Sequence, residues 1–93
     1  MAYEVRAYEV RIEPEAQAVL KTAPQRSRLV IERKLSEAAR IAALREWQDD
    51  AEVREPFRLE LAGFEGSYSI DPGTRRLTLW HLVRRAEGRA RTG

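Results

Sequence analysis

The second half of the chain contains three runs with the residue pattern of β-strands, separated by turn signals. The runs cover residues 57–61, 64–71 and 75–84, where apolar and polar side chains nearly alternate. Gly63 stands at the first junction and Asp71-Pro72-Gly73-Thr74 at the second, and both favour tight turns. A tight turn joins antiparallel strands, because a parallel connection needs a much longer crossover. The pattern therefore predicts an antiparallel meander of three strands.

Two segments with helical periodicity precede the meander. Pro14 suits the first turn of a helix, and this helix is expected to end at Thr22-Ala23-Pro24, which contains a second proline. A longer helix is predicted from Gln25 to about Trp47, with arginines and glutamates on its solvent side. Trp47 is expected to pack between this helix and the sheet. The apolar stripe of the longer helix comprises Leu29 or Val30, Ile31, Leu35, Ala38, Ala39, Ala42 and Leu44.

Residues 3–12 have the composition of a further strand, but their alternation contains a shift of phase. Tyr8, Val10 and Ile12 share one face, whereas the apolar residues before Ala7 fall on the other. Either a bulge near Ala7 restores the phase, or the part of this segment that joins the sheet begins near Ala7.

The order strand, helix, helix, meander predicts an α+β fold. We expect two antiparallel helices on one face of an antiparallel sheet, with the N-terminal strand joining the meander. A chain of 93 residues has room for a single domain. Its core is expected within about residues 7–85, and residues 86–93 are expected to form a flexible tail.

The composition excludes several classes of site. The chain has no cysteine and one histidine, which excludes disulfides, thiol nucleophiles, cysteine zinc sites and multi-histidine metal sites. Seventeen basic and fifteen acidic residues give a net charge of +2, too little for a general nucleic-acid coat. No apolar run is long enough to span a membrane and no signal-peptide pattern is present, so we expect a cytoplasmic protein without membrane contact.

Two long stretches of the sequence resemble the RelE/ParE toxin superfamily. YEVRIEPEAQAVLKTAPQRSRLVIERKL resembles its opening strand and two helices, and PFRLELAGFEGSYSIDPGTRRLTLWHLVRR resembles its second half. The resemblance covers about residues 7–85 and implies the toxin component of a type II toxin–antitoxin system. RelE-type members cleave mRNA in the ribosomal A site without a metal, and ParE-type members inhibit DNA gyrase by binding. The implied partners are therefore a cognate antitoxin and either ribosome-bound mRNA or gyrase, with no cofactor.

The resemblance also implies candidate site residues. Arg58 matches the first basic position of RelE-type enzymes, and Arg85, with Arg84 as the alternative, matches the basic residue after the last strand. These residues are the catalytic candidates. Glu60 stands where those enzymes have a second basic residue, and Glu65 replaces the arginine that contacts the scissile phosphate. The C-terminal tyrosine of many RelE enzymes has no counterpart, so the catalytic set is incomplete.

The acidic replacements argue against cleavage by the family mechanism. Strand alternation puts Arg58 and Glu60 on one face, and if Glu65 joins them the three charges sum to −1. Carboxylates beside a phosphate cost energy in the ground state and the transition state alike. Two hypotheses follow: a metal-independent, ribosome-dependent mRNA endonuclease with an unidentified proton-transfer group, or a non-catalytic binding module. The module would be a ParE-like gyrase inhibitor or a RelE-fold relative without nuclease activity.

The last predicted strand carries two further candidates. His81 is a possible acid or base, since imidazole exchanges protons near neutral pH, but alternation with Leu77 and Leu79 places it on the core face. Alternation places Trp80 and Arg84 together on the more polar face, in conflict with the family match at Arg85.

Trp80 is expected either to stack on a base or a partner's side chain, or to lie half-buried. The local basic cluster at the C-terminal end suits a phosphate backbone or an acidic antitoxin segment, with a solvated tail as the alternative. This cluster comprises Arg84, Arg85, Arg89 and Arg91. No metal site is expected from Glu60 and Glu65, because the pair has no third ligand nearby.

Overall fold

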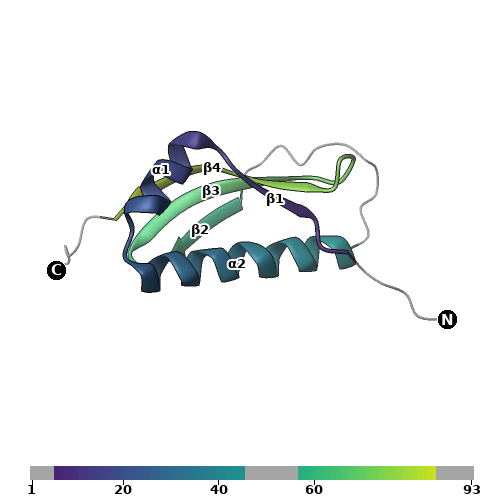
Figure 1. Cartoon of the computed structure of the whole chain (residues 1–93). Coiled ribbons are helices and arrows are strands. Elements are labelled where there is room, and N and C mark those ends of the chain that lie inside the picture. The colour runs from purple at the N-terminus through teal and green to yellow at the C-terminus, as the bar shows by residue number, and fades with distance from the viewer. Residues whose placement is uncertain (1–5, 46–56, 86–93) are drawn as a thin grey trace.

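The computed structural model describes residues 6–45 and 57–85 (Figure 1). Trp47, Arg89, Arg91 and the expected tail lie outside the described residues. The elements in chain order are β1 (Glu9–Ile12), α1 (Pro14–Thr22), α2 (Gln25–Leu44), β2 (Phe57–Leu61), β3 (Phe64–Asp71) and β4 (Arg76–Arg84). The α+β class and the predicted order of elements are confirmed.

The four strands form one mixed sheet with the order β1-β4-β3-β2. The pairs β2–β3 and β3–β4 are antiparallel, as the turn signals predict. β1 runs parallel to β4, with Glu9 beside Arg76, so the expectation of a purely antiparallel sheet is corrected at this edge. The reason is the connection: β1 and β4 are separated by both helices and two strands, which leaves enough chain for a parallel pairing.

The helices cover one face of the sheet. Side chains from α1, α2 and three strands make up one buried cluster, while most described side chains on the opposite, outer face of the sheet remain partly or fully exposed. α1 lies across one end of the sheet and α2 runs along its length (Figure 1). The largest side chains with almost no exposure are Leu20, Ile31, Leu35, Leu59, Leu77, Leu79 and Leu82.

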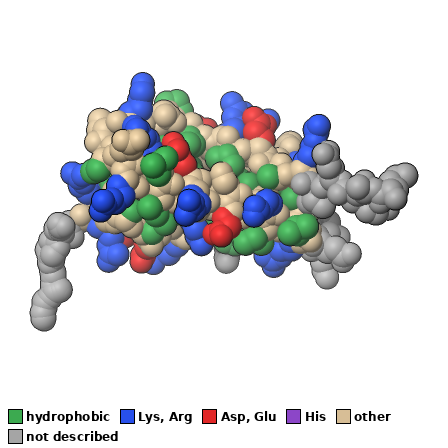
Figure 2. Space-filling model, turned by 60° about the horizontal axis from the view of Figure 1, so that its bottom comes forward, with side chains coloured by type: hydrophobic (Ala, Val, Ile, Leu, Met, Phe, Trp, Pro, Cys, Tyr) green, Lys and Arg blue, Asp and Glu red, His purple; other side chains and the backbone are tan. Residues whose placement is uncertain are grey.

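The buried stripe of α2 is narrower than the sequence pattern predicts. Its buried residues are Ile31, Leu35, Ala39 and Ala42, whereas Leu44 is 66% exposed. Leu44 follows Ala42 by two residues, which places it about 200° around the helix. Leu29 precedes Ile31 by two residues and is exposed for the same reason. The helix ends at Leu44, and not near Trp47 as the sequence pattern predicts. Figure 2 shows this side of the molecule, where basic side chains are spread among exposed hydrophobic ones.

β1 resolves the shift of phase in the N-terminal segment. The strand begins at Glu9, two residues after Ala7. The structure therefore agrees with the alternative in which the part of this segment that joins the sheet begins near Ala7. Tyr8 is buried, and Val10 and Ile12 pack against the same core. The backbone N–H of Tyr8 donates to the carbonyl of Ala39 at 3.1 Å, which ties the start of this strand to α2.

β4 contains a register irregularity that reverses its alternation. Ser67 pairs with His81 and Tyr68 pairs with Leu79, which leaves Trp80 as the extra residue between them. Leu79 before it and Leu82 after it are both buried, at 0% and 2% exposure. A β-bulge has this effect, since one additional residue shifts every later side chain to the other face. The expectation that His81 faces the core is therefore wrong, and His81 is exposed on the outer face.

The turn between β2 and β3 contains a residue in a strained conformation. Ala62 has φ 57° and Gly63 has φ 81°, and a two-residue hairpin turn with both φ values positive favours Asn-Gly. We expect Ala62→Asn to raise the free energy of unfolding by about 0.5–1 kcal/mol, because asparagine tolerates the left-handed region better than alanine. Urea unfolding measures the change. Ala62→Val should lower stability, and an Ala62→Asn protein less stable than the parent would contradict the turn geometry.

Candidate functional site

The candidate site lies on the outer face of β2, β3 and β4. The strand register places Arg58 beside Ser67 and Ser67 beside His81, so these three residues form a row across the sheet. The next row contains Glu60 and Glu65, which face each other between β2 and β3. The polar faces of β2 and β3 therefore coincide, which is the condition under which Glu65 joins Arg58 and Glu60.

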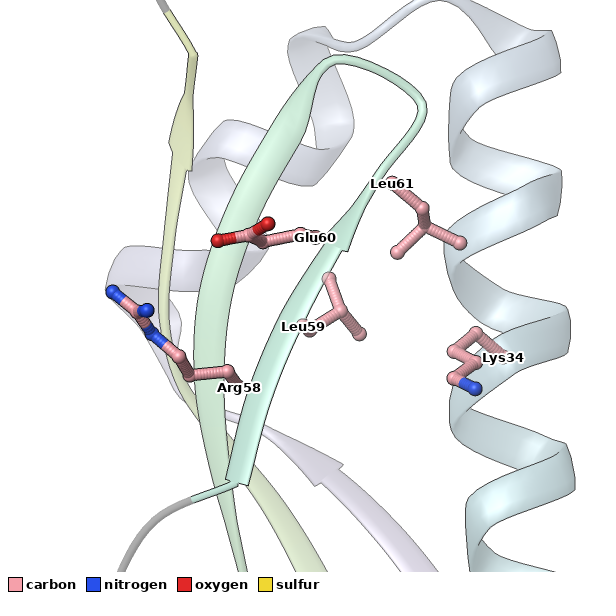
Figure 3. A pocket seen from close by; sticks show the side chains of 5 residues that line it. All are labelled: Lys34, Arg58, Leu59, Glu60 and Leu61. Atoms are coloured by element: carbon pink, nitrogen blue, oxygen red, sulfur yellow. The ribbon is translucent and has the colours of Figure 1, made fainter.

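β2 separates charged from apolar side chains by simple alternation. In Figure 3, Arg58 and Glu60 extend across the neighbouring strand, whereas Leu59 and Leu61 point toward α2. These residues and Lys34 line an open groove between β2 and α2. Leu59 is buried at the base of this arrangement, so the position of β2 relative to α2 is fixed by packing.

Arg85, and not Arg84, joins the two glutamates. The Arg85 guanidinium lies 3.8 Å from the Glu60 carboxylate and 3.9 Å from the Glu65 carboxylate. The backbone N–H of Arg85 donates to the carbonyl of Gly63 at 2.8 Å, which holds the residue beside the hairpin. Arg84 points to the opposite face, with its guanidinium 5.5 Å from the centre of the Phe64 ring. The bulge in β4 is the reason, because it exchanges the faces of every residue after Trp80.

The formal charges of this cluster cancel. Arg58 and Arg85 contribute two positive charges, while Glu60 and Glu65 contribute two negative ones. The side chains of Arg85 and the glutamates are about half exposed, so their ion pairs add little stability. They nevertheless place two carboxylates beside the guanidinium of Arg85. Arg58 has no ion pair with any carboxylate in the part of the chain that the structure describes.

Sequence reasoning missed that His81 belongs to the same face as Arg58. A usable signal was present in the sequence: Leu79 and Leu82 are three residues apart, which strict alternation cannot place on one buried face. Gly66 on the neighbouring strand was a second signal, because a Cβ at this position would meet the backbone carbonyl of His81. The structure thus brings together Arg58, His81 and Arg85, with Trp80 beside them.

Tyr68 does not replace the missing C-terminal tyrosine. Its ring stacks on Phe57 with centroids 5.3 Å apart and belongs to the buried cluster on the helix side of the sheet. Burial raises the pKa of the Tyr68 phenol above its ordinary value, which makes it a poorer source of a phenolate. The residue therefore contributes to packing and lies on the opposite face from Arg58.

Two other kinds of site are absent from the described residues. Within residues 6–45 and 57–85, no three histidine, cysteine or acidic side chains are grouped so that they could hold a metal ion. Neither α1 nor α2 is long and apolar enough to cross a membrane. The chemistry available on the described outer face is that of arginines, carboxylates, hydroxyls, one imidazole and one indole.

Comparison with known proteins finds relatives in structure and none in sequence. No family model and no curated protein matches the sequence. A chain of the toxin–antitoxin complex RelBE2 from Mycobacterium tuberculosis matches with a TM-score of 0.61 and 22% identity, over 90% of this chain and 98% of that one. The isolated Escherichia coli RelE toxin matches with a TM-score of 0.63 and 12% identity, over 89% of each chain.

An archaeal RelE structure matches this chain to a similar degree as the two bacterial ones. A chain of the RelE–RelB complex from Pyrococcus horikoshii matches with a TM-score of 0.62 and 14% identity, over 89% of this chain and 100% of that one. These matches cover about nine-tenths of the chain, and they confirm at the level of the fold the resemblance that the sequence indicates. The chain has the fold of the RelE toxins.

Proposed function

We propose that this chain is the toxin-like component of a type II toxin–antitoxin system and acts on ribosome-bound mRNA during translation. The observation that carries the proposal is the structural match to RelE toxins over about nine-tenths of the chain. Two of the matching structures are complexes with an antitoxin, which supports a cognate antitoxin as the partner of this chain. The proposed site of action is the cytoplasm, where the mRNA is translated.

The outer face supports contact with RNA. The guanidinium of Arg58 is exposed and unpaired among the described residues, and guanidinium groups bind phosphate through two parallel hydrogen bonds. In a cleavage reaction, the ribose 2′-hydroxyl attacks the adjacent phosphate, a base removes its proton, and an acid protonates the leaving oxygen. Arg58 would stabilise the charge that develops on the phosphate. The base and the acid would come from the imidazole of His81 and the carboxylates of Glu60 and Glu65, which lie nearest to Arg58 on this face.

Induced expression in a bacterial host tests the proposal. We expect growth arrest with new mRNA ends at A-site codons on translating ribosomes. Arg58→Ala should reduce the cleavage rate about 10- to 100-fold, because it removes a charge-assisted contact to the phosphate. Arg33→Ala, on the exposed side of α2, is the matched control and should leave the rate unchanged. Equal loss from both substitutions would contradict a role for the outer face.

The second candidate is a non-catalytic binding module, either a ParE-like gyrase inhibitor or a RelE-fold relative that lacks nuclease activity. The contacts of Arg85 with Glu60 and Glu65 favour it, because they place two carboxylates where the family mechanism requires cations. Growth arrest without new mRNA ends would support this candidate. A gyrase supercoiling assay would then distinguish a gyrase inhibitor from a RelE-fold relative that lacks nuclease activity.

A further inference from the structure

Trp80 and His81 lie together on the outer face because of the bulge in β4. In a regular strand, two consecutive side chains point to opposite faces. Here both are exposed, while Leu79 and Leu82 on either side of them are buried. The sheet thus presents an indole and an imidazole side by side in the middle of its open face. Bulges frequently occur where a strand directs a side chain toward a ligand.

The indole ring of Trp80 is held in place by a hydrogen bond. Its Nε1–H donates to the hydroxyl of Ser69 on β3 at 2.7 Å, and the side chain remains 47% exposed. This contact satisfies the polar atom of the ring and draws the indole toward the outer face of β3. A tryptophan fixed in this way keeps an aromatic surface available without the entropy cost of ordering a free side chain.

The charges of the outer face leave its centre positive. At one end Arg76 pairs with Glu9 at 3.5 Å, and at the other end Arg85 contacts both glutamates. Between these ends, Arg11 on β1 and Arg58 on β2 have no ion pair with any carboxylate among the described residues. Arg11 lies beside Thr78 in the register and Arg58 lies in the row of His81.

Arg11 and Arg58, which have no ion pair within residues 6–45 and 57–85, flank the aromatic pair. β1 and β2 are the edges of the sheet, with β4 and β3 between them, so their backbones are about 14 Å apart at three strand spacings. Trp80 and His81 stand on β4 between these edges. An aromatic surface between two cations is complementary to a base between two phosphates.

We propose that Trp80 and His81 form a binding platform for single-stranded RNA, on which the indole stacks against a base while the two flanking arginines bind the phosphates. The platform rests on the proposed function for the choice of RNA as the ligand. It assigns the indole a role that the family resemblance does not supply, since the resemblance concerns the arginines of β2 and of the C-terminal end.

The experiment uses the full chain carrying Trp47→Phe, so that Trp80 is the only tryptophan and reports its own fluorescence. The probe is a hexamer of uridine, compared with an RNA duplex of the same length. We expect the hexamer to quench the fluorescence of Trp80 and the duplex to leave it unchanged, because paired bases are not free to stack on a side chain. Equal quenching by the duplex would overturn the proposal.

The second measurement is the affinity for a labelled hexamer. Trp80→Ala should weaken binding about 5- to 100-fold, as removal of one stacking partner does in other single-strand binders. Val83→Ala, at an exposed position on the same face of β4, is the control and should bind like the parent. Circular dichroism verifies that each variant is folded. A folded Trp80→Ala protein with unchanged affinity would overturn the platform.

The platform and the proposed toxin role fail in distinguishable ways. Hexamer binding that depends on Trp80, without growth arrest on expression, would support the platform and remove the toxin role. If the parent protein arrests growth and cleaves mRNA, but Trp80→Ala binds the hexamer as tightly as the parent, the toxin role is supported and the platform is overturned.

Discussion

Replacing Leu79 by alanine is expected to lower the free energy of unfolding by about 2–5 kcal/mol, the range for large-to-small changes in a core. Leu79 has 0% exposure and lies in β4, between β1 and β3, in the buried cluster under the helices. Its removal loses apolar burial and leaves a cavity. For a small domain this is a large part of the total stability.

Leu44→Ala is the matched control for this prediction. The sequence pattern places both leucines in apolar stripes, but the side chain of Leu44 is 66% exposed. We expect Leu44→Ala to change the free energy of unfolding by less than about 0.5 kcal/mol, as surface substitutions generally do. Urea unfolding of both variants measures the difference. Similar losses at the two positions would show that Leu44 is buried in solution.

Gly66→Ala is expected to destabilise the protein by about 2–4 kcal/mol, because the new methyl group would occupy the space of the His81 carbonyl. Gly66 pairs with Leu82 on β4 and with Leu59 on β2, in the centre of the sheet. The obstacle is backbone, which cannot rotate away as a flexible side chain could. The strand pairing at the bulge must therefore open or shift.

Ser67→Ala provides the control for the glycine, since it alters the adjacent position of β3 on the outer face and should cost less than about 1 kcal/mol. Trp80 adds a second readout besides urea unfolding. In the Trp47→Phe background, where Trp80 is the only tryptophan, a shift of the bulge would change the hydrogen bond between the Trp80 indole and Ser69, and with it the fluorescence. A Gly66→Ala protein as stable as the parent, with unchanged fluorescence, would contradict the close approach of β3 to β4.

The order and bounds of most elements follow from local patterns. Pro14 begins α1, and the runs 57–61 and 64–71 are strands with the predicted ends. These features depend on interactions between residues close in the chain, such as backbone conformational preferences at proline and glycine and the alternation within one strand. The sharing of one polar face by Arg58, Glu60 and Glu65 also follows, since a tight hairpin fixes the register of β2 and β3.

The arrangement of the candidate site could not be predicted from local sequence patterns alone. Strict alternation puts His81 in the core and Arg84 on the polar face, and the bulge at Trp80 reverses both placements. A bulge forms where packing of residues far apart in the chain outweighs regular pairing. Here Leu79 and Leu82 must both be buried, and Gly66 on the neighbouring strand permits the close approach.

The sequence by itself thus determines the elements, the α+β class and the charged face of the β2–β3 hairpin, because each depends on neighbours along the chain. Only the tertiary structure decides that β1 joins β4 in parallel and that Arg85 meets Glu60 and Glu65. It also decides that Trp80 and His81 share the open face with Arg58. These features arise where separate strands are packed under the same two helices, and the burial of leucines from distant positions fixes which side chains remain outside.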